Sequence, residues 1–294
     1  MWHYSHRYRI YLQGVESFSF LSFFSSHVHK TVKALLRYLS FLFSEGQNES
    51  DIGDAVRNAL AHGLITRDQL YITSKISPYE LGTQKAQEAC SSILQRLGLD
   101  YIDLLLIHWP GAAKTPLSSA ENSIKRRETW RVLERQVESG TVKAIGVSNY
   151  EIHHLEDLFT YAKFVPAVNQ IECHPLWPQQ ELRQYCKDRG IHIVAYSSFG
   201  SGALLQCSEV QNIATSSNKT AAQMLLCWGL QKGCAVLPKS NRPERIREYS
   251  PLLAPMQPDP TGRFISSESE SALDRLGLSS NTRRKFCWDS REVA

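Results

Sequence analysis

The stretch Leu97–Pro110, LGLDYIDLLLIHWP, decides the fold class of this sequence. Apart from Asp103, its central part, Tyr101–Ile107, is apolar on consecutive positions rather than on alternate ones. Consecutive apolar positions are typical of parallel strands that are covered on both faces, whereas alternation marks a strand with one face in water. The stretch therefore predicts a buried strand of a parallel α/β fold.

Outward from this stretch, further windows of the same kind occur from residue 70 onward. The other predicted strands are Leu70–Ser74, Ala144–Val147, Ala167–Ile171, His192–Ala195 and Ala235–Leu237. Amphipathic helical stripes separate them, and repeated strand–helix alternation predicts a parallel α/β fold. A doubly wound sheet and a closed barrel both fit the alternation. The GxGxxG fingerprint of dinucleotide-binding sheets is absent, because Gly200 and Gly202 lack the third glycine.

The helical stripes carry their own start and stop signals. Ala86, Ala89, Ile93 and Leu97 share one helix face, and Gly98 follows as a C-terminal stop. Thr220 with Gln223 predicts a capping box at the start of a later helix. The window Tyr249–Arg263 contains four prolines, so we expect an irregular surface loop there.

Composition narrows the class of protein. The chain has 294 residues with 42% hydrophobic and 21% charged residues, which is ordinary for a globular domain with a sizeable core. The net charge of +4 is spread along the chain and forms no nucleic-acid stripe. The apolar run Phe18–Phe24 is too short to span a bilayer. We expect neither a nucleic-acid partner nor a membrane.

Seven cysteines are scattered along the chain without a CxxC pair. This pattern predicts no metal site and no disulfide framework. Buried, reduced thiols and a cytoplasmic location are the simplest interpretation.

Several motifs in order give the sequence a family resemblance. Besides Leu97–Pro110, they are Asn48–Gly53 (NESDIG), Tyr71–Lys75 (YITSK), Ala144–Tyr150 (AIGVSNY), Pro166–Pro175 (PAVNQIECHP), Ala195–Gly200 (AYSSFG) and Leu237–Ile246 (LPKSNRPERI). In this order and spacing they resemble the aldo-keto reductases, closest to the glyoxal or diketogluconate reductase branch. The resemblance covers residues 48 to 248 and resumes at Phe264–Leu276.

The resemblance implies a (β/α)8 TIM-type barrel with its site at the C-terminal ends of the strands. It also implies an NADPH-dependent oxidoreductase that reduces small aldehydes or ketones to alcohols, and a monomer. Residues 28–294 would form the barrel domain, with a proline-rich insert at 249–263 and a divergent segment at 1–27.

By the same resemblance, Lys75 and His108 match catalytic positions, and Trp109 matches a substrate-pocket position. The match also implies a set of residues that bind NADPH or NADP+. Ser148, Asn149 and Gln170 would bind the nicotinamide carboxamide, Tyr196 would stack on its ring, Ser197, Phe199 and Ser201 would wrap the pyrophosphate, and Lys239, Ser240 and Arg245 would surround the 2′-phosphate.

The N-terminal quarter departs from the family pattern. Counting back without gaps from Asn48, the family's catalytic tyrosine falls on Gly46 and its aspartate on Phe41. Neither side chain has the required chemistry, so the first two barrel strands are expected to be degenerate or replaced. The alternative to an active reductase is therefore an impaired NADPH-binding pseudoenzyme or a splice variant.

Overall fold

The structure, a computed structural model, describes residues 49–240, 242–249, 256–278 and 283–294. Six parallel strands form one sheet in the order of the chain, and each strand pairs with the next. The strands are β1 (Thr73–Ile76), β2 (Ile102–Ile107), β3 (Val142–Ser148), β4 (Val168–Glu172), β5 (His192–Tyr196) and β6 (Ala235–Val236). A strand occurs at each of the six predicted places, with the bounds of the first one shifted, and the predicted parallel α/β fold is confirmed.

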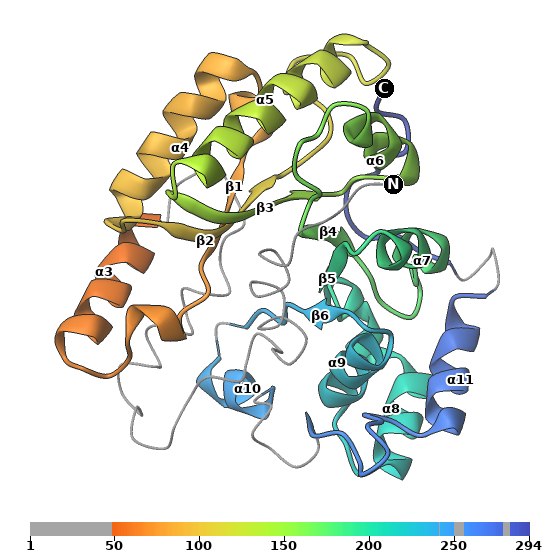
Figure 1. Cartoon of the computed structure of the whole chain (residues 1–294). Coiled ribbons are helices and arrows are strands. Elements are labelled where there is room, and N and C mark those ends of the chain that lie inside the picture. Colours follow the sequence, from red (N-terminus) through yellow and green to blue (C-terminus); the bar gives the residue numbers. More distant parts are fainter. Residues whose placement is uncertain (1–48, 241, 250–255, 279–282) are drawn as a thin grey trace.

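Helices cover the outside of the curved sheet (Figure 1). They are α3 (Glu49–Ala61), α4 (Thr83–Leu97), α5 (Glu121–Glu138), α6 (Ile152–Phe159), α7 (Gln180–Asp188), α8 (Ser208–Ser216), α9 (Ala221–Gln231), α10 (Pro243–Glu248) and α11 (Ser267–Leu276). Among the described residues, the 3-10 helices η1 (Arg67–Gln69), η2 (Pro78–Glu80) and η3 (Gly200–Gln206) lie in the connections. Parallel strands joined by helices bring all strand C-termini to one edge, where functional residues of such folds gather.

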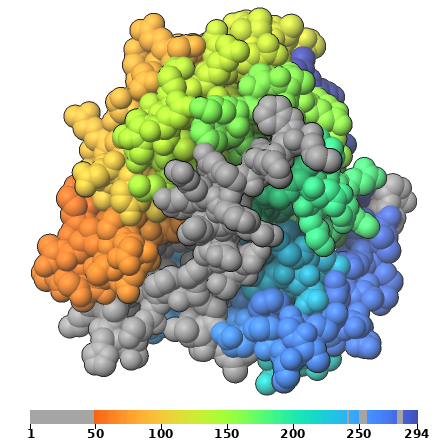
Figure 2. Space-filling view, viewed as in Figure 1, coloured from red at the N-terminus to blue at the C-terminus, as the bar shows by residue number. Residues whose placement is uncertain are grey.

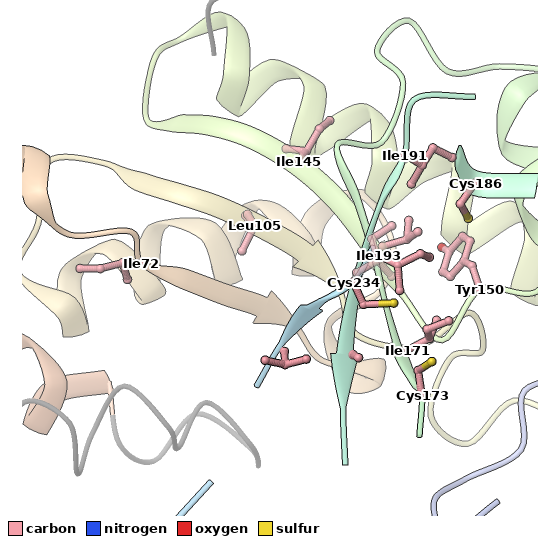
Figure 3. Packing of buried hydrophobic residues seen from close by; sticks show 14 of the residues in the cluster. Ile72, Leu105, Ile145, Tyr150, Ile171, Cys173, Cys186, Ile191, Ile193 and Cys234 are labelled. Carbon is pink, nitrogen blue, oxygen red and sulfur yellow. The ribbon is translucent and has the colours of Figure 1, made fainter. Parts of the chain in front are cut away.

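Two separate apolar clusters show that the sheet is buried on both faces. The larger cluster lies between the strands and the helices. Figure 3 shows three of its members, Leu105 on β2, Ile145 on β3 and Ile193 on β5. The smaller cluster consists of Leu104, Leu106, Val168 and Val194, with alanines and Leu237 packed against it. Neighbouring residues such as Leu104 and Leu105 thus face opposite sides, which explains the consecutive apolar positions in the sequence.

The predicted helix signals are confirmed. Gly98 ends α4 in the left-handed conformation, with φ 61°, and its amide donates to the carbonyls of Leu94 and Gln95. Thr220 caps α9: its hydroxyl accepts from the Gln223 amide, and the Gln223 side chain accepts from the Thr220 amide. Local backbone chemistry at these ends was readable from sequence because it depends on residues only a few positions apart.

Two details of the prediction were wrong. The first strand begins at Thr73 and ends at Ile76, not at Leu70–Ser74, because Leu70 still caps η1. The proline-rich window is irregular over Met256–Arg263, as expected, but it is not wholly at the surface. Tyr249 and Met256 are 4% and 2% exposed, because both pack into the larger apolar cluster.

The predictions for Phe41, Gly46 and the first two barrel strands lie outside the described residues, as does the apolar run Phe18–Phe24. In the part of the chain that the structure describes, no helix combines the length and apolar character needed to cross a bilayer.

Candidate active site

Four of the predicted cofactor residues form one buried polar group where β3, β4 and β5 end. Ser148 is the last residue of β3, Gln170 lies in β4, and Tyr196 ends β5. Asn149 follows β3 with φ 64°, a conformation that turns the chain sharply and that asparagine tolerates. All four side chains are at most 5% exposed.

Asn149 is the centre of this group. Its Nδ2 donates to the His108 carbonyl oxygen and to Ser148 Oγ, each at 3.0 Å. Its Oδ1 accepts from the Tyr196 hydroxyl at 2.7 Å. Ser148 Oγ in turn donates to the backbone carbonyl oxygen of Gln170 at 2.8 Å. The hydrogen bonds join the ends of four strands, β2 to β5, and hold their polar groups in a fixed arrangement.

Lys75 and His108 lie side by side at the ends of β1 and β2. The His108 amide donates to the carbonyl of Ile76, the residue after Lys75. Burial lowers the pKa of Lys75 to about 7. Burial, with a smaller contribution from the Lys75 charge, lowers the pKa of His108 to about 3. At neutral pH the histidine is therefore uncharged, while the lysine is poised between its two protonation states.

Trp288, near the end of the chain, contacts both the predicted catalytic residue His108 and the predicted substrate-pocket residue Trp109. The Trp288 ring lies 6.4 Å from His108 and 6.2 Å from Trp109, at interplanar angles of 68° and 84°. Near-perpendicular rings at these distances are a favourable aromatic arrangement. Trp288 is nevertheless 64% exposed, so one side of its indole faces outward beside His108 and Trp109.

The predicted pyrophosphate loop follows β5. Ser197 and Ser201 have φ angles of 52° and 53°, and the loop continues into η3. Ser197 Oγ contacts Cys287 Sγ at 3.3 Å. The Phe199 ring lies 5.4 Å from the ring of Tyr249, which follows α10. This ring contact brings the loop after β5 and the segment around α10 together.

The predicted 2′-phosphate residues follow β6. Lys239 and Arg245 are exposed, and Arg245 lies in α10. Ser240 is partly buried, and its hydroxyl accepts from the Arg242 amide at 3.1 Å. Unlike the group around Asn149, these residues present charge to solvent.

Sequence reasoning missed two features at this edge. Glu172, the last residue of β4, is 1% exposed and lies opposite Tyr196 in the sheet register. The chain segment 283–294, here called the tail, contributes Cys287 and Trp288 to the site. A carboxylate at the end of a predicted buried strand, directly after Ile171, was the available signal for Glu172. Nothing local in the sequence indicated the tail.

The comparisons with known proteins agree on one family. The profile of the aldo/keto reductase family matches residues 38–253. A glyoxal reductase of Bacillus subtilis (strain 168) is 41% identical over 206 residues, which cover 70% of this chain and 69% of that protein.

Solved structures agree as well. An aldo-keto reductase enzyme from a Medee basin deep-sea metagenome library superposes with a TM-score of 0.73 at 30% identity, over 93% of both chains. An aldo-keto reductase complexed with NADPH superposes with a TM-score of 0.70 at 27% identity, over 87% of this chain and 81% of that one.

Proposed function

Since this chain belongs to the aldo/keto reductase family of oxidoreductases, a family of (β/α)8 barrels, we propose that NADPH binds across the strand ends and that Lys75 supplies the proton for carbonyl reduction. The observation that carries the proposal is the meeting of the Asn149 hydrogen-bond group with Lys75 and His108 at one edge of the sheet. The match and the reductases among the relatives give no support to the non-catalytic alternative.

The donor and acceptor set at the edge fits a nicotinamide. A carboxamide offers one oxygen acceptor and an NH2 donor, and Ser148, Asn149 and Gln170 offer the complementary hydroxyl and amide groups. Tyr196, buried next to them, presents an aromatic ring. Bound NADPH would supply the hydride. Binding requires the Tyr196 hydroxyl to exchange its hydrogen bond to Asn149 Oδ1 for another partner or to share that oxygen.

The reaction also requires a proton at the carbonyl oxygen. A general acid works best when its pKa lies near the operating pH, and the pKa of Lys75 is lowered to about 7. His108, with a pKa of about 3, holds no extra proton at neutral pH. We therefore assign the proton to the Lys75 ammonium group, delivered directly or through one water, and assign to neutral His108 the role of orienting the carbonyl oxygen by a hydrogen bond.

The exposed cations after β6 fit a phosphate. Lys239 and Arg245 flank a segment with the Ser240 hydroxyl, and two cations with a hydroxyl suit a dianionic 2′-phosphate. This assignment accounts for NADPH rather than NADH as the preferred cofactor.

NADPH oxidation with methylglyoxal and with an aromatic aldehyde tests the proposal. Wild type should turn over at least one of them, and Lys75→Met should lower kcat by about 10²–10⁴, the usual contribution of a general acid. The NADPH Kd of the variant should stay within about twofold, because the cofactor contacts come from other strands. Lys85→Met, on the exposed face of α4, controls for the substitution itself.

Two results would contradict the proposal, each in a different part. Tight NADPH binding by wild type with a background rate for both aldehydes would refute the reductase assignment. Full turnover by Lys75→Met would instead remove the lysine from its role as the acid.

The state of the cysteines bears on the cellular location. The cysteines at 90, 173, 186, 207, 227, 234 and 287 are all free thiols. Free thiols suit a reducing compartment, so the cytoplasm is the location we assign.

A further inference from the structure

Glu172 holds the tail in place through both of its carboxylate oxygens. Oε1 accepts from the Phe286 amide at 2.7 Å, and Oε2 accepts from the Cys287 amide at 2.9 Å. Oε1 also accepts from His174 Nε2 at 2.9 Å, so the imidazole carries its proton on that nitrogen. Two consecutive backbone amides thus point at one buried carboxylate.

The contacts of the carboxylate keep it ionised. Burial alone would raise the pKa of Glu172, but the hydrogen bonds from His174, Phe286 and Cys287 outweigh burial and lower it. The His174 ring, itself fully buried, also lies 5.4 Å from the Phe286 ring. The carboxylate of Glu172 and the imidazole of His174 therefore bind this part of the tail together.

Other contacts hold the tail before the clamped amides and after Trp288. The Arg284 amide donates to the Leu176 carbonyl at 2.9 Å, and Ser290 Oγ donates to Glu151 at 2.8 Å. The Val293 carbonyl accepts from His154 at 2.8 Å, which places the last residues beside α6 (Figure 1). In the space-filling view the dark-blue end of the chain borders the green surface there (Figure 2).

We propose that Glu172 is a positioning residue for substrate selection: by clamping the Phe286 and Cys287 amides it holds Trp288 against His108 and Trp109, so that two indoles form a wall that favours aromatic aldehydes. This inference rests on the proposed function. Trp288 is one residue beyond the clamped amides and is 64% exposed, so no burial of its own fixes the indole in place. The backbone hydrogen bonds of its neighbours do so instead.

The carboxylate is required because both of its oxygens accept. In Glu172→Gln one oxygen becomes an NH2 group. This group is a donor and cannot accept the hydrogen bond of a tail amide. Glu172→Asp keeps the buried charge beside His174 but is one methylene shorter, so it cannot reach both amides. The aspartate variant serves as the second test if the glutamine variant does not fold.

The first measurement follows the tail itself by hydrogen exchange of the full chain. Exchange of the amides of 286–288 should rise at least tenfold in Glu172→Gln and in Glu172→Asp, and should not change in Trp288→Ala. Wild-type protection of these amides in the Glu172 variants would overturn the clamp. This measurement needs neither cofactor nor turnover.

The second measurement follows selectivity through binding of 4-nitrobenzaldehyde and methylglyoxal to the NADP+ complex, which cannot deliver a hydride. In Glu172→Gln and in Trp288→Ala the Kd of the aromatic aldehyde should rise at least fivefold, and that of methylglyoxal less than twofold. The double variant should be no worse than either single one. Ser290→Ala removes the tail hydrogen bond to Glu151 and leaves both hydrogen bonds to Glu172 in place. It is the matched control and should bind both aldehydes as wild type does.

The outcomes separate the inference from the function. Multiplied losses in the double variant, or equal losses for both aldehydes, would show that Glu172 does not act through Trp288. Failure of wild type to bind NADP+ would refute the proposed function, while the exchange measurement would still decide the clamp.

Discussion

The two ends of the proposed cofactor site are built in opposite ways. Around Asn149, buried hydroxyl, amide and phenol groups already bond to one another across four strand ends. After β6, Lys239 lies exposed in the segment before α10, and Arg245 lies exposed in α10.

The difference has a physical reason. Buried polar groups must have hydrogen-bond partners before the cofactor binds, because leaving one unpaired costs about 1–3 kcal/mol. Exposed cations carry no such cost, so they add charge without adding rigidity. The first end should set the geometry of binding, and the second should set the choice of cofactor.

The strongest test of the rigid end is Asn149→Ala. It leaves the Tyr196 hydroxyl without its acceptor and removes the link to the His108 carbonyl. We expect the free energy of unfolding to fall by about 1–3 kcal/mol. We also expect NADPH and NADH to bind about 10–100-fold more weakly, by the same factor for both. Chemical denaturation and fluorescence titration measure the two effects. A loss confined to NADPH would contradict the division between the two ends.

The matching test of the exposed end is Lys239→Ala combined with Arg245→Ala. We expect about a tenfold weaker Kd for NADPH, because two charge-assisted contacts to the 2′-phosphate are lost in a solvent-exposed setting. The Kd for NADH should change by less than about twofold, since NADH lacks that phosphate. Equal losses for the two cofactors would show that the cofactor lies in another orientation.

Burial of Lys75 should make the free energy of unfolding depend on pH. The pKa of Lys75 falls from 10.5 to about 7 on folding, so between these values the unfolded chain binds more protons and stability rises with pH. The rise is at most about 1.4 kcal/mol per pH unit, because a single proton is involved. Lys75 keeps some exposure, so we expect a slope below this limit. The full penalty remains below pH 7, and it has disappeared above pH 10.5.

Lys75→Met removes this dependence. The variant should therefore be more stable than wild type at pH 6.5, and the difference should shrink towards pH 9.5. Denaturation curves at several pH values measure it, with Lys85→Met as the control. A difference that stays constant with pH would mean that Lys75 titrates as an ordinary lysine.

Salt gives the smallest expected effect. Exposed charges are screened over about 10 Å at 0.1 M ionic strength. Raising salt from about 0.05 to 0.5 M should weaken NADPH binding by several-fold and leave NADH nearly unchanged. Titrations with both cofactors across this range measure the difference. The double variant at Lys239 and Arg245 should lose the salt dependence, and its persistence there would place the phosphate elsewhere.

Much of the fold was predictable because its signals are local. The strand windows, the Gly98 stop and the Thr220 cap depend on neighbours within one or two turns, and they are confirmed apart from the bounds of the first strand. The start of β1 was misplaced because η1 extends to Gln69, and the burial of Tyr249 and Met256 was missed because it depends on distant packing. The site residues from Lys75 to Arg245 were named through a family resemblance, and their roles remain predictions for the experiments above.

By itself the sequence determined which segments are strands, in what order they come, and which polar residues stand at their ends. Runs of apolar residues and helix-capping residues depend only on neighbours in the sequence, so they can be recognised without the tertiary structure. Only the tertiary structure decided that Asn149 joins four strands, that burial lowers the pKa of Lys75 to about 7, and that Glu172 clamps a tail more than a hundred positions away in the chain. Hydrogen bonds and burial of that kind arise when a curved sheet brings remote segments to one edge, and no local pattern records which segments will meet.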